Sequence, residues 1–185
     1  MGLGNPGPRY IATRHNAGFW LVDNLAVQAQ VEFRQEAKFQ GEVCRVEQAD
    51  FKYWLLKPKT FMNHSGQAVA ALANYYKIPV EQILVVHDEL DFPPGRARLK
   101  RGGGDGRHNG LKSVIAHLGS KKFLRLRLGI GHPGISSEVT NYVLDSPSRD
   151  DQTAIESAMI AALEVIPLIV VGGLDGAMQQ LHSRT

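Results

Sequence analysis

The side chains best suited to chemistry in this 185-residue sequence are a histidine, an aspartate and several asparagines. His15 follows a stiff N-terminal segment of glycines and prolines, and a histidine fixed at such an edge is a candidate general base. Asp88 comes directly after the continuous apolar run 83–87, which is typical of a strand buried on both faces. We expect Asp88 to orient the imidazole of His15, as a carboxylate does for a base histidine.

Further polar side chains stand where strands and loops are expected to end, and these are Asn5, Asn63, His108 and Asn109. Asparagine amides can bind the carbonyls of a neutral substrate or a developing oxyanion. The sequence contains no G-x-S-x-G motif for a nucleophilic serine and no H-x-x-x-H, H-E-x-x-H or paired-cysteine spacing for a metal. The chemistry we expect is therefore direct attack by a base-activated water, without a metal.

The N-terminal glycines also spell G-x-G-x-x-G over residues 2–7, the fingerprint of a dinucleotide-binding loop. That fingerprint requires a strand before it and a helix opening directly from it. Here only Met1 precedes the loop, and residues 8–11 separate it from the first helical pattern. A nucleotide cofactor is therefore the weaker interpretation.

Composition indicates one globular domain, with 43% hydrophobic and 21% charged residues. The single cysteine, Cys44, excludes an intramolecular disulfide and fits a reducing compartment, so we expect a cytoplasmic location. The N-terminus shows no signal-peptide pattern, and no apolar run reaches the length of a membrane span.

Positive charge is concentrated between residues 96 and 127, where ten basic residues face one acidic residue and the net charge is +9. The rest of the chain carries −6. Basic residues at alternate positions of two expected strands share a strand face, which predicts a phosphate-backbone site beside a glycine-rich loop. The alternative is an ordinary solvated surface. The ten are Arg96, Arg98, Lys100, Arg101, Arg107, Lys112, Lys121, Lys122, Arg125 and Arg127.

Hydrophobic periodicity predicts helices alternating with strands, which indicates one three-layer α/β domain. Asn16 is expected to cap the first helix and Ser65 the second. Helices are expected over 17–30, 65–77, 109–118 and 148–182, the last interrupted near Pro167 and Gly172. Strands are expected over 41–47 and 53–57, joined across 48–50, and over 83–87, 96–100 and 124–130.

Six segments in order resemble bacterial-type peptidyl-tRNA hydrolases over essentially the whole chain. They are GLGNPGPRY (2–10), TRHNAG (13–18), KTFMNHSGQAV (59–69), VVHDELDFPPG (85–95), HNGLKS (108–113) and LRLGIGHPG, in the region from Arg125 to Gly134. The resemblance implies hydrolysis of the ester that joins a peptide to the 3′ ribose of tRNA. It also implies a single domain over residues 1–185, with a mixed twisted sheet flanked by helices, acting as a monomer without metal or cofactor.

The resemblance assigns roles by matching position. His15 would activate water with Asp88 as its partner, and Asn5 would contact the substrate near the ester and separate peptidyl from free aminoacyl substrates. For Tyr10 and Phe61, the two aromatic residues that are given a role below, packing in the hydrophobic core is the alternative. Tyr10, Phe61, Asn63 and Asn109 would line the groove for the peptide and the 3′ end, His108 would support it, and Lys100 and Arg127 would hold the 5′ phosphate of tRNA.

The sequence departs from the family pattern in three places. The apolar strand that usually precedes the glycine turn is expected to be missing before Met1, at a cost to stability. Arg107 stands where glycine is common, and Ser136, Ser137 and Glu138 replace a lid region that often carries lysines, so we expect altered tRNA contacts. The rival interpretation is a non-catalytic RNA-binding relative of the same fold, against which the intact polar residues argue.

Overall fold

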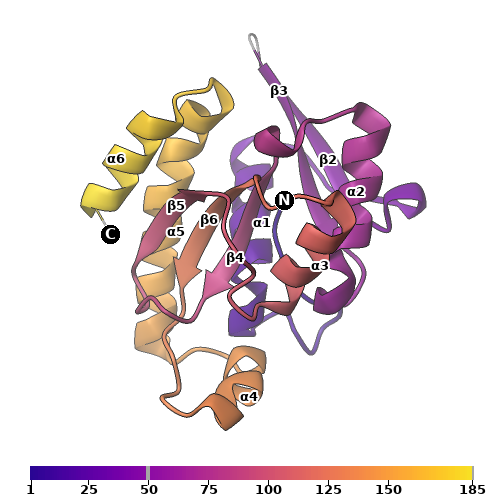
Figure 1. Cartoon of the computed structure of the whole chain (residues 1–185). Helices are drawn as coiled ribbons and strands as arrows, with labels where there is room; N and C mark the ends of the chain where they lie inside the picture. Colours follow the sequence, from indigo (N-terminus) through magenta and orange to yellow (C-terminus); the bar gives the residue numbers. More distant parts are fainter. Residues whose placement is uncertain (49–50, 185) are drawn as a thin grey trace.

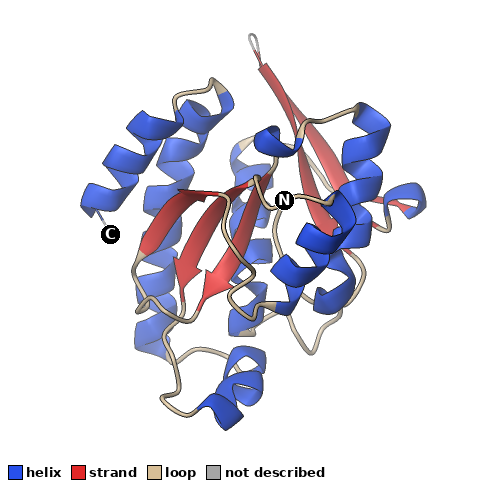
Figure 2. Ribbon diagram, in the orientation of Figure 1, coloured by secondary structure: helices blue, strands red, loops and turns tan. Residues whose placement is uncertain are grey.

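The computed structural model describes residues 1–48 and 51–184, and it has the three-layer α/β architecture predicted from the sequence (Figures 1 and 2). One half of the central layer is an antiparallel sheet in the order β1 (Arg34–Glu36), β2 (Gly41–Gln48) and β3 (Phe51–Pro58). In the other half, β6 (Leu124–Gly129) pairs in parallel with β4 (Leu84–Glu89) and antiparallel with β5 (Ala97–Arg101). The expected join across residues 48–50 includes Ala49 and Asp50, which lie outside the described residues.

The first three residues join the two halves of the central layer. Gly2 pairs in parallel with Val86 of β4, and the Leu3 N–H donates to the Val86 carbonyl at 2.9 Å. On the other side, the Gly2 N–H donates to the carbonyl of Leu56 in β3 at 3.1 Å. Residues 1–3 therefore bridge β3 and β4, and the glycine turn starts from an anchored position.

Helices cover both faces of the central layer because side chains alternate along its strands. Val86 belongs to the core under α1 (Ala17–Gln28), α5 (Arg149–Val170) and α6 (Leu174–Arg184), whereas Val85 belongs to the core under α2 (Ser65–Tyr76) and α3 (Asn109–Leu118). A short helix, α4 (Val139–Leu144), follows β6 and precedes α5 along the chain, and it lies at one end of the molecule (Figure 1). The sequence did not predict α4 or β1.

Both expected side-chain caps are wrong, because α1 and α2 each begin through a 3₁₀ turn, Arg14–Asn16 and Met62–His64. Ser65 already has helical dihedrals (φ −56°, ψ −29°), whereas a capping residue needs non-helical ones. Asn16 makes no capping hydrogen bond, since its side chain binds another segment.

The last helical region breaks at Gly172, as expected, but not at Pro167. Pro167 lies inside α5, which continues to Val170, and the break comes where Gly172 takes a left-handed φ of 87°. Among the described helices, α5 alone has the length and apolar composition to cross a membrane. One face of it is buried against the rest of the fold, as in a core helix: Ile155, Ala158, Met159, Ala162, Leu163, Val165 and Ile166.

Candidate active site

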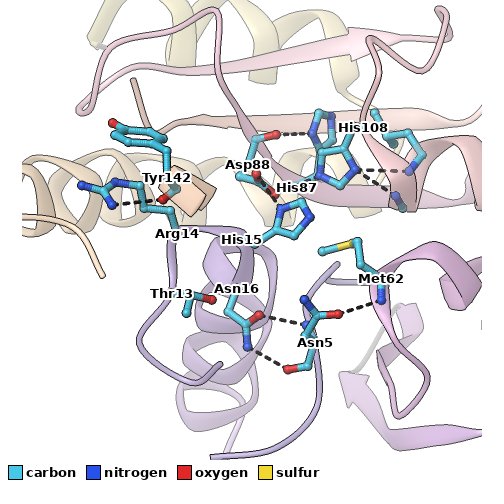
Figure 3. A network of polar contacts seen from close by, with 12 residues as sticks. Asn5, Thr13, Arg14, His15, Asn16, Met62, His87, Asp88, His108 and Tyr142 are labelled. Carbon is cyan, nitrogen blue, oxygen red and sulfur yellow. Dashed lines mark hydrogen bonds and ion pairs between the residues drawn. The ribbon is translucent and has the colours of Figure 1, made fainter. Parts of the chain in front are cut away.

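Three titratable side chains from distant parts of the chain meet at the end of β4 nearest to α3 and the turn before α1 (Figure 3). His15 lies in the 3₁₀ turn before α1, and its Nδ1 is 2.9 Å from Oδ2 of Asp88. His108 is the N-cap residue of α3, and its Nε2 is 2.9 Å from Oδ1 of Asp88. Asp88 lies within β4, not after it as expected, and is 3% exposed. The predicted pairing of His15 with Asp88 is thus present in the structure.

The hydrogen bonds assign a tautomer to each imidazole. Nδ1 of His108 accepts the backbone N–H groups of Gly110 and Leu111 at 3.1 and 3.3 Å, so its proton is on Nε2, which donates to Asp88. Nδ1 of His15 donates to the other oxygen of Asp88, which leaves Nε2 of His15 as the nitrogen that can accept a proton. Asp88 therefore fixes the orientation of both rings.

Burial and charge act against each other on this pair. Burial lowers the pKa of His15, but the charge of Asp88 and its hydrogen bond outweigh burial, and the pKa is raised above 6.5. Burial raises the pKa of Asp88, yet the two histidines, His15 first, hold it well below its usual range. The carboxylate stays ionised around neutral pH, and His15 is a stronger base than a free histidine.

His87 lies behind this cluster and is not among the site residues predicted from the sequence. Its Nδ1 donates to the backbone carbonyl of Asp88 at 2.6 Å, and its ring packs edge-to-face on His108 with centroids 5.1 Å apart. The side chain is 2% exposed, and burial, followed by the charge of His108, lowers the pKa of His87 to about 3. The sequence does carry a signal for this burial: His87 ends the apolar run 83–87, and every residue of such a run is expected to be buried.

The amide of Asn5 is held in one orientation beside the histidines (Figure 3). Its Oδ1 accepts the backbone N–H of Met62 at 2.8 Å, which leaves the NH₂ group as the donor of this amide. The side chain of Asn16 binds both backbone groups of Asn5, accepting from N–H at 2.8 Å and donating to C=O at 3.0 Å. Asn16 and Met62 therefore hold Asn5 in place, and these contacts were not predicted because they form between separate segments of the chain.

Of the remaining residues predicted to line a substrate groove, Phe61, Asn63 and Asn109 lie at the starts of helical segments, and Tyr10 lies in the turn before Arg14–Asn16. Asn63 and Asn109 are exposed, in the 3₁₀ turn before α2 and at the first position of α3. Phe61 is 57% exposed and meets Tyr10 edge-to-face at 6.3 Å, so simple core packing does not account for Phe61. Their contact with substrate stays a prediction.

The predicted basic strand faces lie side by side, because the register of β5 and β6 places Arg98 opposite Arg127 and Lys100 opposite Arg125. Lys100 is exposed, and Arg127 is partly exposed, 3.9 Å from Glu89 and stacked on Phe92. Arg125 differs from the expectation of an exposed cation: it is 3% exposed, and its guanidinium donates to the carbonyls of Gly103 and Gly104. It anchors the glycine-rich loop, so the exposed basic face is smaller than the sequence predicted.

The geometry also admits a cation, although no metal spacing is visible in the sequence. One potential ligand atom each from His15, Asp88 and His108 lies within 4.8 Å of the others. In the hydrogen-bonded arrangement, both oxygens of Asp88 bind ring nitrogens and the second nitrogen of His108 binds backbone N–H groups. These atoms are already satisfied by protein partners, which favours a general-base site.

Fold and site together define a three-layer α/β domain in which a buried histidine–aspartate pair stands beside the oriented amide of Asn5. The family profile described as peptidyl-tRNA hydrolase matches residues 1–185. Peptidyl-tRNA hydrolases of Methylobacillus flagellatus and Neisseria meningitidis serogroup A are 58% and 55% identical, over all of this chain and 96% of each of those proteins. The crystal structure of peptidyl-tRNA hydrolase from Acinetobacter baumannii superposes with a TM-score of 0.97 at 43% identity, over 100% of this chain and 93% of that one.

This chain therefore belongs to the peptidyl-tRNA hydrolase family. The resemblance read from its motifs and the predicted fold class are confirmed.

Proposed function

We propose that the chain hydrolyses the ester between the peptide and the 3′ ribose of peptidyl-tRNA, with His15 as general base and Asp88 as its orienting partner. The observation that carries this proposal is the pair of hydrogen bonds to Asp88, each 2.9 Å long, which leaves Nε2 of His15 as the only proton-accepting ring nitrogen of the pair His15 and His108.

Nε2 of His15 takes a proton from water while the water oxygen attacks the ester carbonyl carbon. The tetrahedral oxyanion is stabilised by amide donors, of which the NH₂ group of Asn5 is the most firmly oriented, through Met62. As the intermediate collapses, the 3′ oxygen of tRNA leaves and takes the proton from His15. Asp88 stabilises the imidazolium that exists between these two steps.

Release of tRNA from N-blocked aminoacyl-tRNA tests this mechanism. The rate should rise with pH through an apparent pKa above 6.5, because the neutral form of His15 is the base and Asp88 raises its pKa. Removing a general base typically costs about 10² to 10⁴ in rate, so His15→Ala should lose at least that in kcat while tRNA binding is kept. His117→Gln, on the far turn of α3, is the matched control and should keep full activity.

Asp88→Asn separates catalysis from structure. Loss of its charge should move the pH limb to lower pH and cut kcat with little change in KM, since orientation acts mainly on the transition state. A variant that melts at a lower temperature yet turns over normally per folded molecule would show that Asp88 is only structural.

The rival function is RNA binding without catalysis. It predicts that neither wild type nor His15→Ala releases tRNA from N-blocked aminoacyl-tRNA, and that the two differ only in stability. The complete His15, Asp88 and Asn5 arrangement favours the hydrolase. We further propose that the chain acts as a monomer in the cytoplasm, which size-exclusion chromatography and fractionation of cells test directly.

A further inference from the structure

Arg14, the residue directly before His15, is buried and has no part in the mechanism above. It is 7% exposed, and its Nη1 donates to the backbone carbonyls of Tyr142, Asp145 and Ser146 at 3.2, 3.2 and 3.0 Å. Its guanidinium also stacks 4.0 Å above the ring of Tyr142 (Figure 3), and Nη2 lies 3.8 Å from the carboxylate of Asp151. A cation suits this place, because carbonyls at the end of a helix carry partial negative charge.

These contacts fix the position of α4. The backbone N–H of Arg14 adds a bond of 3.1 Å to the Asp145 carbonyl, and on the other side the Tyr142 hydroxyl donates to the carbonyl of Ile130 at 2.6 Å. A helix of six residues is too short to be stable by itself, so its tertiary contacts decide where it sits. The side chain of Arg14 is therefore the main polar link between α4 and the turn that carries His15.

The turn Arg14–Asn16 is only three residues long, so its ends cannot move without moving His15. Asn16 holds one end to the Asn5 segment, and Arg14 holds the other to α4. We propose that Arg14 is a positioning residue for the reaction: docking of α4 onto its guanidinium fixes the His15 ring against Asp88. The inference rests on the proposed role of His15 as the base.

Two substitutions test the link without removing a catalytic group. Arg14→Lys keeps the charge, but a single ammonium cannot donate to these carbonyls, lie flat over the Tyr142 ring and approach Asp151 at the same time, as the guanidinium does. Tyr142→Phe keeps the ring and removes the hydroxyl that ties α4 to Ile130. Arg184→Lys, at the exposed pair with Glu164, is the matched control for an arginine-to-lysine change and should behave as wild type.

We expect Arg14→Lys to lower kcat about 10- to 100-fold, the scale of an error of about 1 Å in the position of a reacting group. KM should change by less than about threefold, because the substrate loses no contact. Tyr142→Phe should cause a smaller loss, and the double variant should be no slower than Arg14→Lys alone, since both act through the same docking.

NMR titration of the His15 imidazole gives a readout that does not depend on activity. Its pKa should fall toward 6.5 in both variants, because the elevated value requires the charge and hydrogen bond of Asp88. The titratable groups that face His15 are Asp88 and the ring of His108, 4.9 Å away, with His87 behind His108. Neither variant changes any of these groups.

The inference is overturned if Arg14→Lys only lowers the melting temperature while kcat per folded molecule and the His15 pKa match wild type. A rise in KM with kcat preserved would also overturn it, by making Arg14 a substrate contact. If Arg14→Lys fails to fold, the result for Tyr142→Phe decides. Retained activity in His15→Ala would refute the general-base role itself, which is a separate outcome.

Discussion

Replacing His87 with asparagine should flatten the acid side of the stability curve. Asparagine can keep the N–H donor to the Asp88 carbonyl but does not titrate. In the folded protein the pKa of His87 is about 3, because burial excludes the charged ring, whereas an unfolded histidine titrates near 6.5. Between these values the unfolded chain binds the extra proton, so stability falls as the pH falls, by about 1.4 kcal/mol per pH unit at most.

From pH 6.5 to 4.5 this amounts to about 2 kcal/mol, which wild type should lose and His87→Asn should not. The window ends at 4.5 because below it carboxylates such as Asp88, whose pKa is lowered, add their own loss. His15 contributes nothing within it, since the stabilisation from a raised pKa is fully present below 6.5. Burial also lowers the pKa of His182, but this contribution is common to both proteins and cancels in the comparison.

Urea unfolding at pH 7, 6, 5 and 4.5 measures the effect. At pH 7 the variant should be less stable by about 1 to 2 kcal/mol, owing to the cavity left by the smaller side chain. The two curves should then converge or cross as the pH falls. Parallel curves, or an imidazole signal of His87 that titrates near 6.5 in the folded protein, would refute the reasoning.

Two further predictions concern the substrate. Lys100→Ala and Arg127→Ala should raise KM for full-length peptidyl-tRNA far more than for a minimal 3′ fragment, and should reduce the salt dependence by up to about 0.9 per lost phosphate contact. Arg125→Met is the comparison, since a buried loop anchor should mainly lower the melting temperature; equal effects on both substrates would contradict the assignment of Lys100 and Arg127. Asn5→Asp can keep one oxygen on the Met62 N–H and place the other where the NH₂ group was, so it should improve hydrolysis of unblocked aminoacyl-tRNA, whose ammonium it attracts. An unchanged ratio of rates for blocked and unblocked substrates would show that Asn5 does not sense the blocked amine.

Much of the fold follows from local patterns in the sequence. The helix predicted over 109–118 is α3, residue for residue, because its apolar spacing and its polar N-cap lie within one short segment. The pairing of His15 with Asp88 was also predicted, since a strand end and a rigid turn each place a polar side chain at an edge of the sheet.

Other side-chain contacts could not be predicted in this way, because they depend on how separate segments pack against each other. Asn16 has the sequence context of a helix cap, yet it binds the backbone of Asn5, eleven residues earlier. Arg125 and Arg127 share a strand face, but only the loop that folds over Arg125 makes it a buried anchor. The alternation of residues along a strand predicts on which face of the sheet a side chain lies. How deeply that side chain is buried depends on the segments that pack over it.

The antiparallel pairing of β5 and β6 has an energetic consequence beyond tRNA recognition. Arg98 lies opposite Arg127 and Lys100 opposite Arg125, and like charges at such positions repel each other in the folded chain. A polyanion bound across these strands would relieve that repulsion, which would add to the attraction for tRNA predicted for Lys100 and Arg127. By mass action, binding of tRNA to the folded chain stabilises the fold. The free enzyme is therefore less stable toward unfolding than its complex with tRNA.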